Sequence, residues 1–150
     1  ILPQPVDLNK TWYGKPIVGP NKTWGGLIYG TLAGTLVFLL QQQLYTVPFF
    51  QNLSIIDYPQ QPILLGFFLA FGAIFGDLAK SFIKRRFHKA PGSYWFPWDQ
   101  LDYVIGAFLF SAIVYTPPIS SIIAIVILAP ILHFIANRFS YVLGLKKVKW

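Results

Sequence analysis

Four long blocks of apolar residues constrain this chain more than any other feature. They run from Gly25 to Leu40, Pro62 to Ile83, Leu101 to Thr116 and Ile119 to Leu143. Each is close to the roughly 20 residues that a bilayer-spanning helix needs, although the first and third are short. Only 11% of the residues are charged and 55% are hydrophobic, which is unlike a soluble domain. The sequence predicts one all-α domain over residues 1–150, a polytopic membrane helix bundle with four spans.

The positive charges fall on one side of this arrangement. When the spans alternate in direction, all twelve Lys and Arg residues lie in or next to the N-terminal segment 1–24, the loop 84–99 and the tail after Leu143. The opposite connections, 41–61 and 116–118, contain no Lys or Arg. By the positive-inside rule the basic side is cytoplasmic. The net charge of +7 is explained either by membrane orientation and contact with anionic lipids alone, or by these together with a binding site. We expect no nucleic-acid partner.

Small residues and missing residue types add to this picture. Gly26, Gly30 and Gly34 recur every four positions in the first block, a pattern that lets membrane helices pack closely and that could also support a homodimer.

Cysteine is absent, which excludes disulfides and thiolate metal sites. Methionine is also absent, even at position 1, so we expect further sequence upstream.

Asp77 is the most unusual residue for a membrane helix, because an ionisable side chain within a span is costly and often functional. It lies fifteen residues into the second apolar block. Helical spacing places Lys80, Ser81 and Lys84 on its face. The alternative interpretation is a structural Asp–Lys pair near the membrane surface.

Asp99 and Asp102 lie three residues apart at the head of the third block and therefore share a helix face. Alone, Asp99 would be a helix N-cap and Asp102 a favourable charge at the helix N-terminus. Together with Asp77 they form a set of three carboxylates beside a basic cluster, Lys84, Arg85, Arg86 and Lys89. Hard oxygen donors beside cations suit Mg²⁺ and a polyphosphate. The isolated His88 and His133 are expected to lie outside this site.

The tetrapeptide Asn-Lys-Thr-Trp occurs twice, at residues 9–12 and 21–24. Only the second copy stands in Gly-Pro-Asn-Lys-Thr-Trp-Gly-Gly, directly at the head of a span whose first N–H groups could face phosphate. We therefore interpret Lys22 and Thr23 as the phosphate-binding pair, and Lys10 and Thr11 as part of the loop that leads to it.

Three blocks in this order resemble the CDP-lipid synthases, the membrane cytidylyltransferases: "GPNKTWGG" (19–26), "GDLAKSFIKRR" (76–86) and "DQLD" (99–102). The resemblance spans roughly residues 5–110. Within the superfamily the chain is most similar to the CDP-archaeol synthases, because it reads Asp-Gln-Leu-Asp where phosphatidate cytidylyltransferases usually read Asp-Arg-x-Asp. The Lys-Asp and His-Gly-Gly elements of those enzymes are also missing from its loop.

The resemblance implies a reaction in which a lipid phosphate attacks the α-phosphorus of CTP, with Mg²⁺ as cofactor, in phospholipid biosynthesis at the cytoplasmic face of the cell membrane. The acceptor of that branch is an isoprenoid ether lipid, 2,3-di-O-geranylgeranylglyceryl phosphate. A fifth helix would precede the four spans, with Ile1 and Leu2 as its end. The residue roles that it implies are metal binding for Asp77, Asp99 and Asp102, phosphate binding for Asn21, Lys22, Thr23, Ser81, Lys84 and Arg85, and a catalytic part for Lys84 and the three Asp.

Other functions stay open at this point. A phosphatidate cytidylyltransferase that makes CDP-diacylglycerol is the nearest alternative. A CDP-alcohol phosphotransferase is less consistent with the sequence, since its longer motif of four spaced Asp residues is not found. A small membrane transporter with Asp77 as an ion site would need charges deep in several spans, whereas here all but Asp77 gather at one surface.

Overall fold

The computed structural model describes residues 2–90 and 93–144, and within them the chain is mostly helical. The elements are β1 (Thr11–Trp12), β2 (Lys15–Pro16), α1 (Trp24–Leu44), α2 (Pro48–Leu53), the 3₁₀-helix η1 (Tyr58–Gln60), α3 (Ile63–Arg86), α4 (Trp98–Ser111) and α5 (Ile119–Val142). The helical class predicted from the sequence is confirmed. The short antiparallel hairpin of β1 and β2 is an addition that an all-α prediction does not contain.

Three of the four predicted spans are helices long and apolar enough to cross a membrane: α1, α3 and α5. The third predicted span differs, because α4 has only 14 residues. It is about 21 Å long, against a hydrocarbon thickness of about 30 Å. The helix begins before Leu101 and ends well before Thr116. Thr116 precedes Pro117, and a residue before proline disfavours helical backbone.

The helix starts follow from short-range sequence features. Thr23 is the N-cap of α1, and its hydroxyl accepts a hydrogen bond from the Gly26 N–H at 3.1 Å. Proline stands at the N-cap position of α3, α4 and α5. At its other end α1 continues past the predicted limit at Leu40 to Leu44, which provides the extra turn that a short first span needs.

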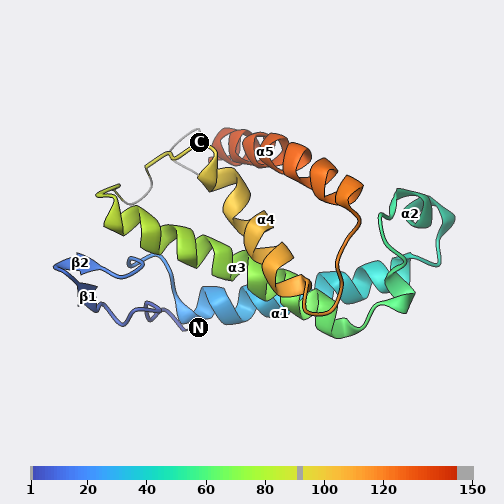
Figure 1. Ribbon diagram of the computed structural model, residues 1–150, viewed down its shortest axis with the longest axis horizontal. Coiled ribbons are helices and arrows are strands. Elements are labelled where there is room, and N and C mark those ends of the chain that lie inside the picture. The colour runs from blue at the N-terminus through green and yellow to red at the C-terminus, as the bar shows by residue number, and fades with distance from the viewer. Residues whose placement is uncertain (1, 91–92, 145–150) are drawn as a thin grey trace.

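Helices α1 and α3 lie side by side (Figure 1). A Cβ built on Gly30 would lie 2.7 Å from the Ile74 side chain, and one on Gly34 would lie 2.6 Å from the Ala70 Cβ. Gly30 and Gly34 of the predicted glycine stripe are therefore a packing surface that faces α3 within the chain, whereas a Cβ on Gly26 would meet only the Thr23 side chain. A homodimer stays a prediction that this stripe does not support.

The tightest helix contact is the crossing of α3 and α4, which is built on glycines from both helices (Figure 1). A Cβ on Gly76 would lie 2.1 Å from the Asp102 carbonyl oxygen, and one on Gly106 would lie 2.1 Å from the Gly72 carbonyl oxygen. Only residues without a side chain allow backbones to approach this closely. The crossing brings the C-terminal half of α3 against the first turns of α4.

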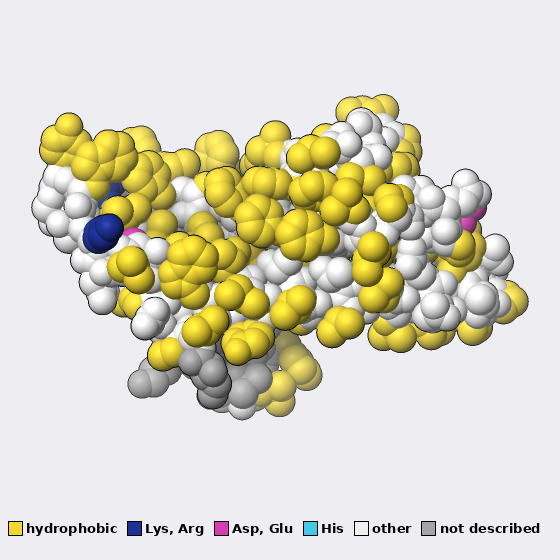
Figure 2. Space-filling model, turned by 90° about the horizontal axis from the view of Figure 1, so that it is seen from below, with side chains coloured by type: hydrophobic (Ala, Val, Ile, Leu, Met, Phe, Trp, Pro, Cys, Tyr) yellow, Lys and Arg dark blue, Asp and Glu magenta, His cyan; other side chains and the backbone are white. Residues whose placement is uncertain are grey.

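Most apolar side chains point outward. Within the described residues, the buried hydrophobic side chains are only Phe38, Leu65, Val104 and Ala129. The face shown in Figure 2 is covered with hydrophobic side chains, and charged ones show only near its ends. A soluble protein would not expose so much apolar surface, so these helices require a lipid environment.

Some predictions concern residues at the two ends of the chain. Lys146, Lys147 and Lys149, which belong to the predicted cytoplasmic tail, lie outside the described residues, as does Ile1. Leu2 is described, and its carbonyl oxygen accepts a hydrogen bond from the Gly25 N–H at 2.9 Å. A helix ending at Ile1 and Leu2 stays a prediction.

Candidate functional site

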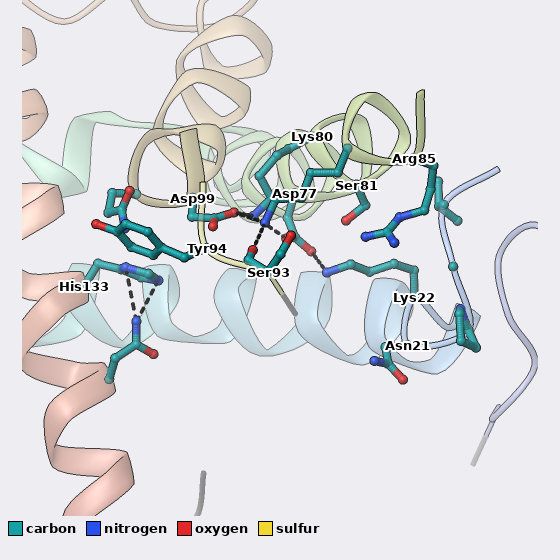
Figure 3. A pocket seen from close by; sticks show the side chains of 16 residues that line it. Asn21, Lys22, Asp77, Lys80, Ser81, Arg85, Ser93, Tyr94, Asp99 and His133 are labelled. Carbon is teal, nitrogen blue, oxygen red and sulfur yellow. Dashed lines mark hydrogen bonds and ion pairs between the residues drawn. The ribbon is translucent and has the colours of Figure 1, made fainter. Parts of the chain in front are cut away.

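A polar cavity of about 470 Å³ lies where the N-terminal segment, α3, the loop after it, α4 and α5 meet (Figure 3). This volume is within the usual range for a small-molecule site, about 300 to 1,000 Å³. Its lining contains Val18, Gly19, Pro20, Asn21, Lys22, Asp77, Lys80, Ser81, Lys84, Arg85, Ser93, Tyr94, Asp99, Gln100, His133 and Asn137.

The centre of this site is a cluster of lysine and aspartate side chains. The Lys80 Nζ lies 3.2 Å from Asp77 Oδ1, 3.2 Å from Asp99 Oδ1 and 2.7 Å from Asp102 Oδ2. Asp77 and Lys80 belong to α3, whereas Asp99 and Asp102 belong to α4. The glycine crossing of the two helices therefore assembles the three carboxylates around one ammonium group.

Two further lysines complete the cluster. Lys22, from the N-terminal segment, pairs with Asp77 (Figure 3). Lys84 donates to Asp99 Oδ1 and to the Ser93 carbonyl oxygen, both at 2.6 Å. The lysines are as numerous as the carboxylates, so the cluster is balanced in charge. Such pairing is expected where charges are partly removed from water.

Asp7 holds the loop that carries Asn21 and Lys22. The Asp7 side chain is buried and accepts hydrogen bonds from the backbone N–H groups of Asn9, Val18 and Gly19, at 3.0, 3.0 and 3.1 Å. Burial by itself raises the pKa of Asp7, but these N–H donors outweigh it and hold the pKa below its ordinary value.

Backbone pairing fixes the same loop from its other side. The Val6 N–H donates to the Lys22 carbonyl oxygen at 2.7 Å, and the Trp24 N–H donates to the Gln4 carbonyl oxygen at 3.0 Å. Gly19 has a φ of +115°, a conformation that other residues rarely adopt, just before the Pro-Asn-Lys turn. The position of Lys22 is thus determined by the segment that precedes it.

Arg86 fastens the hairpin to the end of α3. Its guanidinium donates to the carbonyl oxygens of Trp12 and Pro16, at 2.6 and 2.7 Å, and lies over the rings of Trp12 and Phe82. The first Asn-Lys-Thr-Trp copy contains strand β1 of this hairpin and the two residues before it, outside the cavity lining. The second copy contributes Asn21 and Lys22 to the lining, so the two copies lie in different surroundings.

Several buried polar atoms at the cavity have no hydrogen-bond partner among the described residues. They are the Nε of Arg85, the Oγ of Ser93 and the Oε1 of Gln100. Buried polar groups are rarely left unpaired, so atoms of this kind beside a cavity are available to a ligand. Arg85 lies at the end of the cavity near Lys22 and Ser81, whereas Tyr94 and His133 lie at the other end (Figure 3).

Most of the residues predicted for the site line the cavity: Asn21, Lys22, Asp77, Ser81, Lys84, Arg85 and Asp99. Asp102 reaches it through Lys80. Thr23 is not in the lining, because its hydroxyl caps α1. The N-cap of α4 is Pro97 and not Asp99, although the Asp99 carboxylate still accepts the Trp95 N–H at 2.7 Å.

The expectation that His133 lies outside the site is wrong. His133 and Asn137 line the cavity, and the Asn137 Nδ2 lies 3.2 Å from the His133 Nε2. Their spacing of four residues on an otherwise apolar span was a signal for one polar face. His88 is outside the cavity, beside Lys15, as expected. Sequence reasoning also missed Asp7, Gln100 and the central place of Lys80.

A second cavity, of about 410 Å³, lies between α3 and α4. Its lining is apolar apart from Lys80 and Asp102 and includes Phe75, Ala79, Ile83, Trp95, Trp98 and Leu109. Because Lys80 borders both cavities, an elongated molecule in the apolar one could present a polar end to the lysine and aspartate cluster.

Comparison with known proteins decides the family. A family model described as CarS-like, CDP-archaeol synthase, matches residues 3–150. The chain belongs to the CDP-archaeol synthase family. CDP-archaeol synthase of Methanocaldococcus jannaschii is 41% identical over 147 residues, which cover 97% of this chain and 83% of that protein. CDP-archaeol synthase of Pyrococcus furiosus is 36% identical with the same coverage.

A solved structure supports the same assignment. It is described as an intramembrane enzyme for archaeal membrane lipids biosynthesis, and it superimposes on this chain with a TM-score of 0.73 at 29% identity. The match covers 89% of this chain and 78% of the other. Membership of the CDP-archaeol synthase family thus rests on both sequence and fold, and the lysine and aspartate cluster lies within the matched family region.

Proposed function

We propose that this chain transfers CMP from CTP to an isoprenoid ether-lipid phosphate, 2,3-di-O-geranylgeranylglyceryl phosphate, giving CDP-archaeol and pyrophosphate. Membership of the CDP-archaeol synthase family supports this reaction. The observation that carries it in the structure is one cavity that joins Lys22 and Arg85 to the carboxylates of Asp77 and Asp99. Cations and carboxylates side by side are suited to a metal-bound triphosphate.

The reaction asks the protein to position groups and to neutralise charge. A phosphate oxygen of the lipid forms a bond to the α-phosphorus of CTP, and the bond between that phosphorus and the oxygen leading to the β-phosphate breaks. The attacking phosphate is already ionised at neutral pH, so no general base is required. Lys22, Lys84 and Arg85 would hold the phosphates, with Asn21 and Ser81 as further hydrogen-bond partners, whereas Thr23, predicted for the same role, caps α1.

The donor set around Lys80 fits Mg²⁺ in its chemistry, since Mg²⁺ prefers carboxylate oxygens together with waters and substrate phosphates. Among the described residues, no three Asp or His side chains lie close enough together to enclose an ion directly. The ammonium of Lys80 lies between the carboxylates instead. Asp77, Asp99 and Asp102 would hold Mg²⁺, which when bound neutralises charge on the triphosphate oxygens.

The apolar cavity between α3 and α4 would receive the lipid. Its lining suits isoprenoid chains, and it reaches the cluster at Lys80 and Asp102. The lipid would then enter sideways from the bilayer and meet CTP at the end of the molecule that carries the hairpin. With four spans in alternation, that end faces the cytoplasm, as the distribution of Lys and Arg predicts.

Turnover by the purified protein tests this proposal. We expect pyrophosphate from CTP only when the lipid phosphate and Mg²⁺ are both present, together with a CDP-lipid product. An ester phosphatidate should be a poorer acceptor than the ether lipid phosphate. A faster reaction with the ester would favour a phosphatidate cytidylyltransferase, and no turnover with any lipid phosphate would contradict the synthase assignment altogether.

Carboxylate variants test the site itself. Asp99→Asn and Asp102→Asn should each lower kcat by about 100-fold or more, because metal charge stabilisation is worth several kcal/mol. Asp57→Asn is the matched control, since Asp57 lies next to η1 and hydrogen-bonds Gln60, away from the cavity lining. Near-normal rates in both site variants would remove these carboxylates from the mechanism.

A further inference from the structure

Lys80 has the most ion-pair contacts in the cluster, yet the proposed reaction gives it no part. Lys22 contacts Asp77 and Lys84 contacts Asp99, whereas the Lys80 ammonium lies within 3.2 Å of a carboxylate oxygen on each of the three aspartates. Among the described residues, Asp102 has Lys80 as its sole ion-pair partner. Both side chains are largely withdrawn from solvent, at 15% and 5% exposure.

We propose that Lys80 is a positioning residue that acts as a resident cation of the carboxylate cluster, and that a divalent cation competes with it for the same carboxylates. This inference rests on the proposed function, which assigns those carboxylates to Mg²⁺. In the absence of metal, the ammonium of Lys80 holds the three negative charges together where α3 and α4 cross.

Electrostatics supplies the reason. Three carboxylates that share one site repel each other, and a buried charge without a partner is strongly unfavourable. The glycine contacts press the two helix backbones together at the level of these side chains, so the carboxylates cannot relieve the repulsion by moving the helices apart. A cation built into α3 offsets this repulsion when no metal ion occupies the cluster.

The same cation makes metal binding conditional. A divalent ion that enters the cluster meets the positive charge of Lys80, and this repulsion weakens its binding. The phosphates of CTP bring negative charge that offsets the repulsion. Lys80 therefore favours binding of the metal–nucleotide complex over binding of the metal alone. The binding of metal and the binding of nucleotide are coupled in this way.

The test measures Mn²⁺ binding by the full chain in detergent, without CTP, by the loss of the free-ion electron paramagnetic resonance signal. Lys80→Met keeps an unbranched side chain, shorter by one heavy atom, and removes its charge. We expect it to lower the Kd for Mn²⁺ by about tenfold or more, since unit charges about 4 Å apart interact appreciably even at high effective dielectric. CTP should then lower the Kd for Mn²⁺ by a smaller factor in Lys80→Met than in the unaltered chain.

Matched variants separate charge from structure. Lys10→Met removes a lysine that has no ion-pair contact with these carboxylates and should leave the Kd unchanged. Lys80→Arg retains the charge and should bind Mn²⁺ no more tightly than the unaltered chain. Lys80→Met with Asp102→Asn restores the charge balance, which guards against misfolding of the single variant, and should reverse the gain in affinity.

The outcomes are distinguishable. If the unaltered chain binds Mn²⁺ and Lys80→Met binds it with the same or a higher Kd, the role of Lys80 is overturned and the proposed function still stands. Failure of every variant to bind Mn²⁺, with or without CTP, would overturn both the metal site and the role of Lys80. Equal tightening in Lys80→Met and Lys80→Arg would also overturn it, because the effect would then be independent of charge.

Discussion

At the scale of single residues, the site depends on side chains that hydrogen-bond to the backbone of its loops as much as on side chains that face the cavity. Asp7 is the clearest case, because it accepts three backbone N–H groups and does not line the main cavity. Its partners Val18 and Gly19 directly precede the turn with Asn21 and Lys22. The loop that would bind phosphate is therefore ordered by a carboxylate that does not itself face the cavity.

Asp7→Asn should weaken CTP binding more than it slows the reaction. The amide that replaces the carboxylate has one acceptor oxygen, and its NH₂ group would face backbone donors. Hydrogen bonds to charged groups contribute about 1.5 to 3 kcal/mol each, so we expect KM for CTP to rise about tenfold or more. We expect kcat to change less than threefold. Steady-state kinetics would check this, and a fall in kcat with unchanged KM would contradict it.

The lowered pKa of Asp7 gives the same loop a pH dependence. Because the folded pKa lies below the ordinary value of 3.8, the carboxylate stabilises the loop above that value, and this contribution is lost as pH falls through the folded pKa. Hydrogen exchange at Val18 and Gly19, corrected for the intrinsic effect of pH, should therefore stay slow down to about pH 4 and accelerate below it. The same amides in Asp7→Asn should lack this transition.

At the scale of helices, the crossing of α3 and α4 determines whether the three carboxylates meet. Asp77 and Asp102 lie on different helices, and each is next to or opposite a glycine of the contact. The closeness of the backbones lets a single lysine side chain reach all of them. The site is therefore a property of how two helices pack and not of either helix alone.

Gly76→Ala tests that dependence. Its Cβ would meet the Asp102 backbone oxygen at 2.1 Å, so the helices must separate, and overpacking of this kind costs about 1 to 3 kcal/mol. We expect activity to fall at least tenfold and the thermal midpoint to drop by several degrees. Gly30→Ala is the matched control, since its Cβ would meet only the flexible end of Ile74. Equal losses in both variants would argue against a special role for this crossing.

The sequence revealed the helices and most of the candidate site because both depend on local patterns. Apolar blocks gave α1, α3 and α5, and the spacing of Asp99 and Asp102 correctly predicted a shared face. The position of the Lys80 ammonium between all three carboxylates could not be predicted, because it depends on the α3–α4 crossing, which no pattern within one helix encodes. Asp7 was missed for a similar reason, since its partners lie eleven and twelve residues further along the chain.

At the scale of the whole molecule, the charges and the apolar surface divide the chain into two regions. The segment before α1, the C-terminal part of α3 and the loop after it carry the described basic residues apart from Arg138 in α5, whereas the end with α2 and η1 carries none. Between them, apolar side chains face outward (Figure 2). This arrangement is that of a chain lying across a bilayer with its candidate site at one surface.

The absence of cysteine makes the orientation directly measurable. Single cysteines can replace Tyr13 in the hairpin, Asn52 in α2 and Thr116 after α4, all of which are exposed. With four spans, an impermeant maleimide should label Tyr13→Cys from the cytoplasmic side only, and the other two from the opposite side only. Labelling of Thr116→Cys from the cytoplasmic side would mean that the short α4 does not cross the membrane.

The charge balance of the cluster also bears on how the chain is made. Asp99 and Asp102 enter the membrane region on α4, and their lysine partners, Lys80 and Lys84, are on α3, which is synthesised first. Alone, α4 would carry two unpaired negative charges, whereas beside α3 they are compensated as soon as the loop is complete. We therefore expect α3 and α4 to leave the insertion machinery as a pair, with α3 acting as an intramolecular chaperone for the helix that follows it.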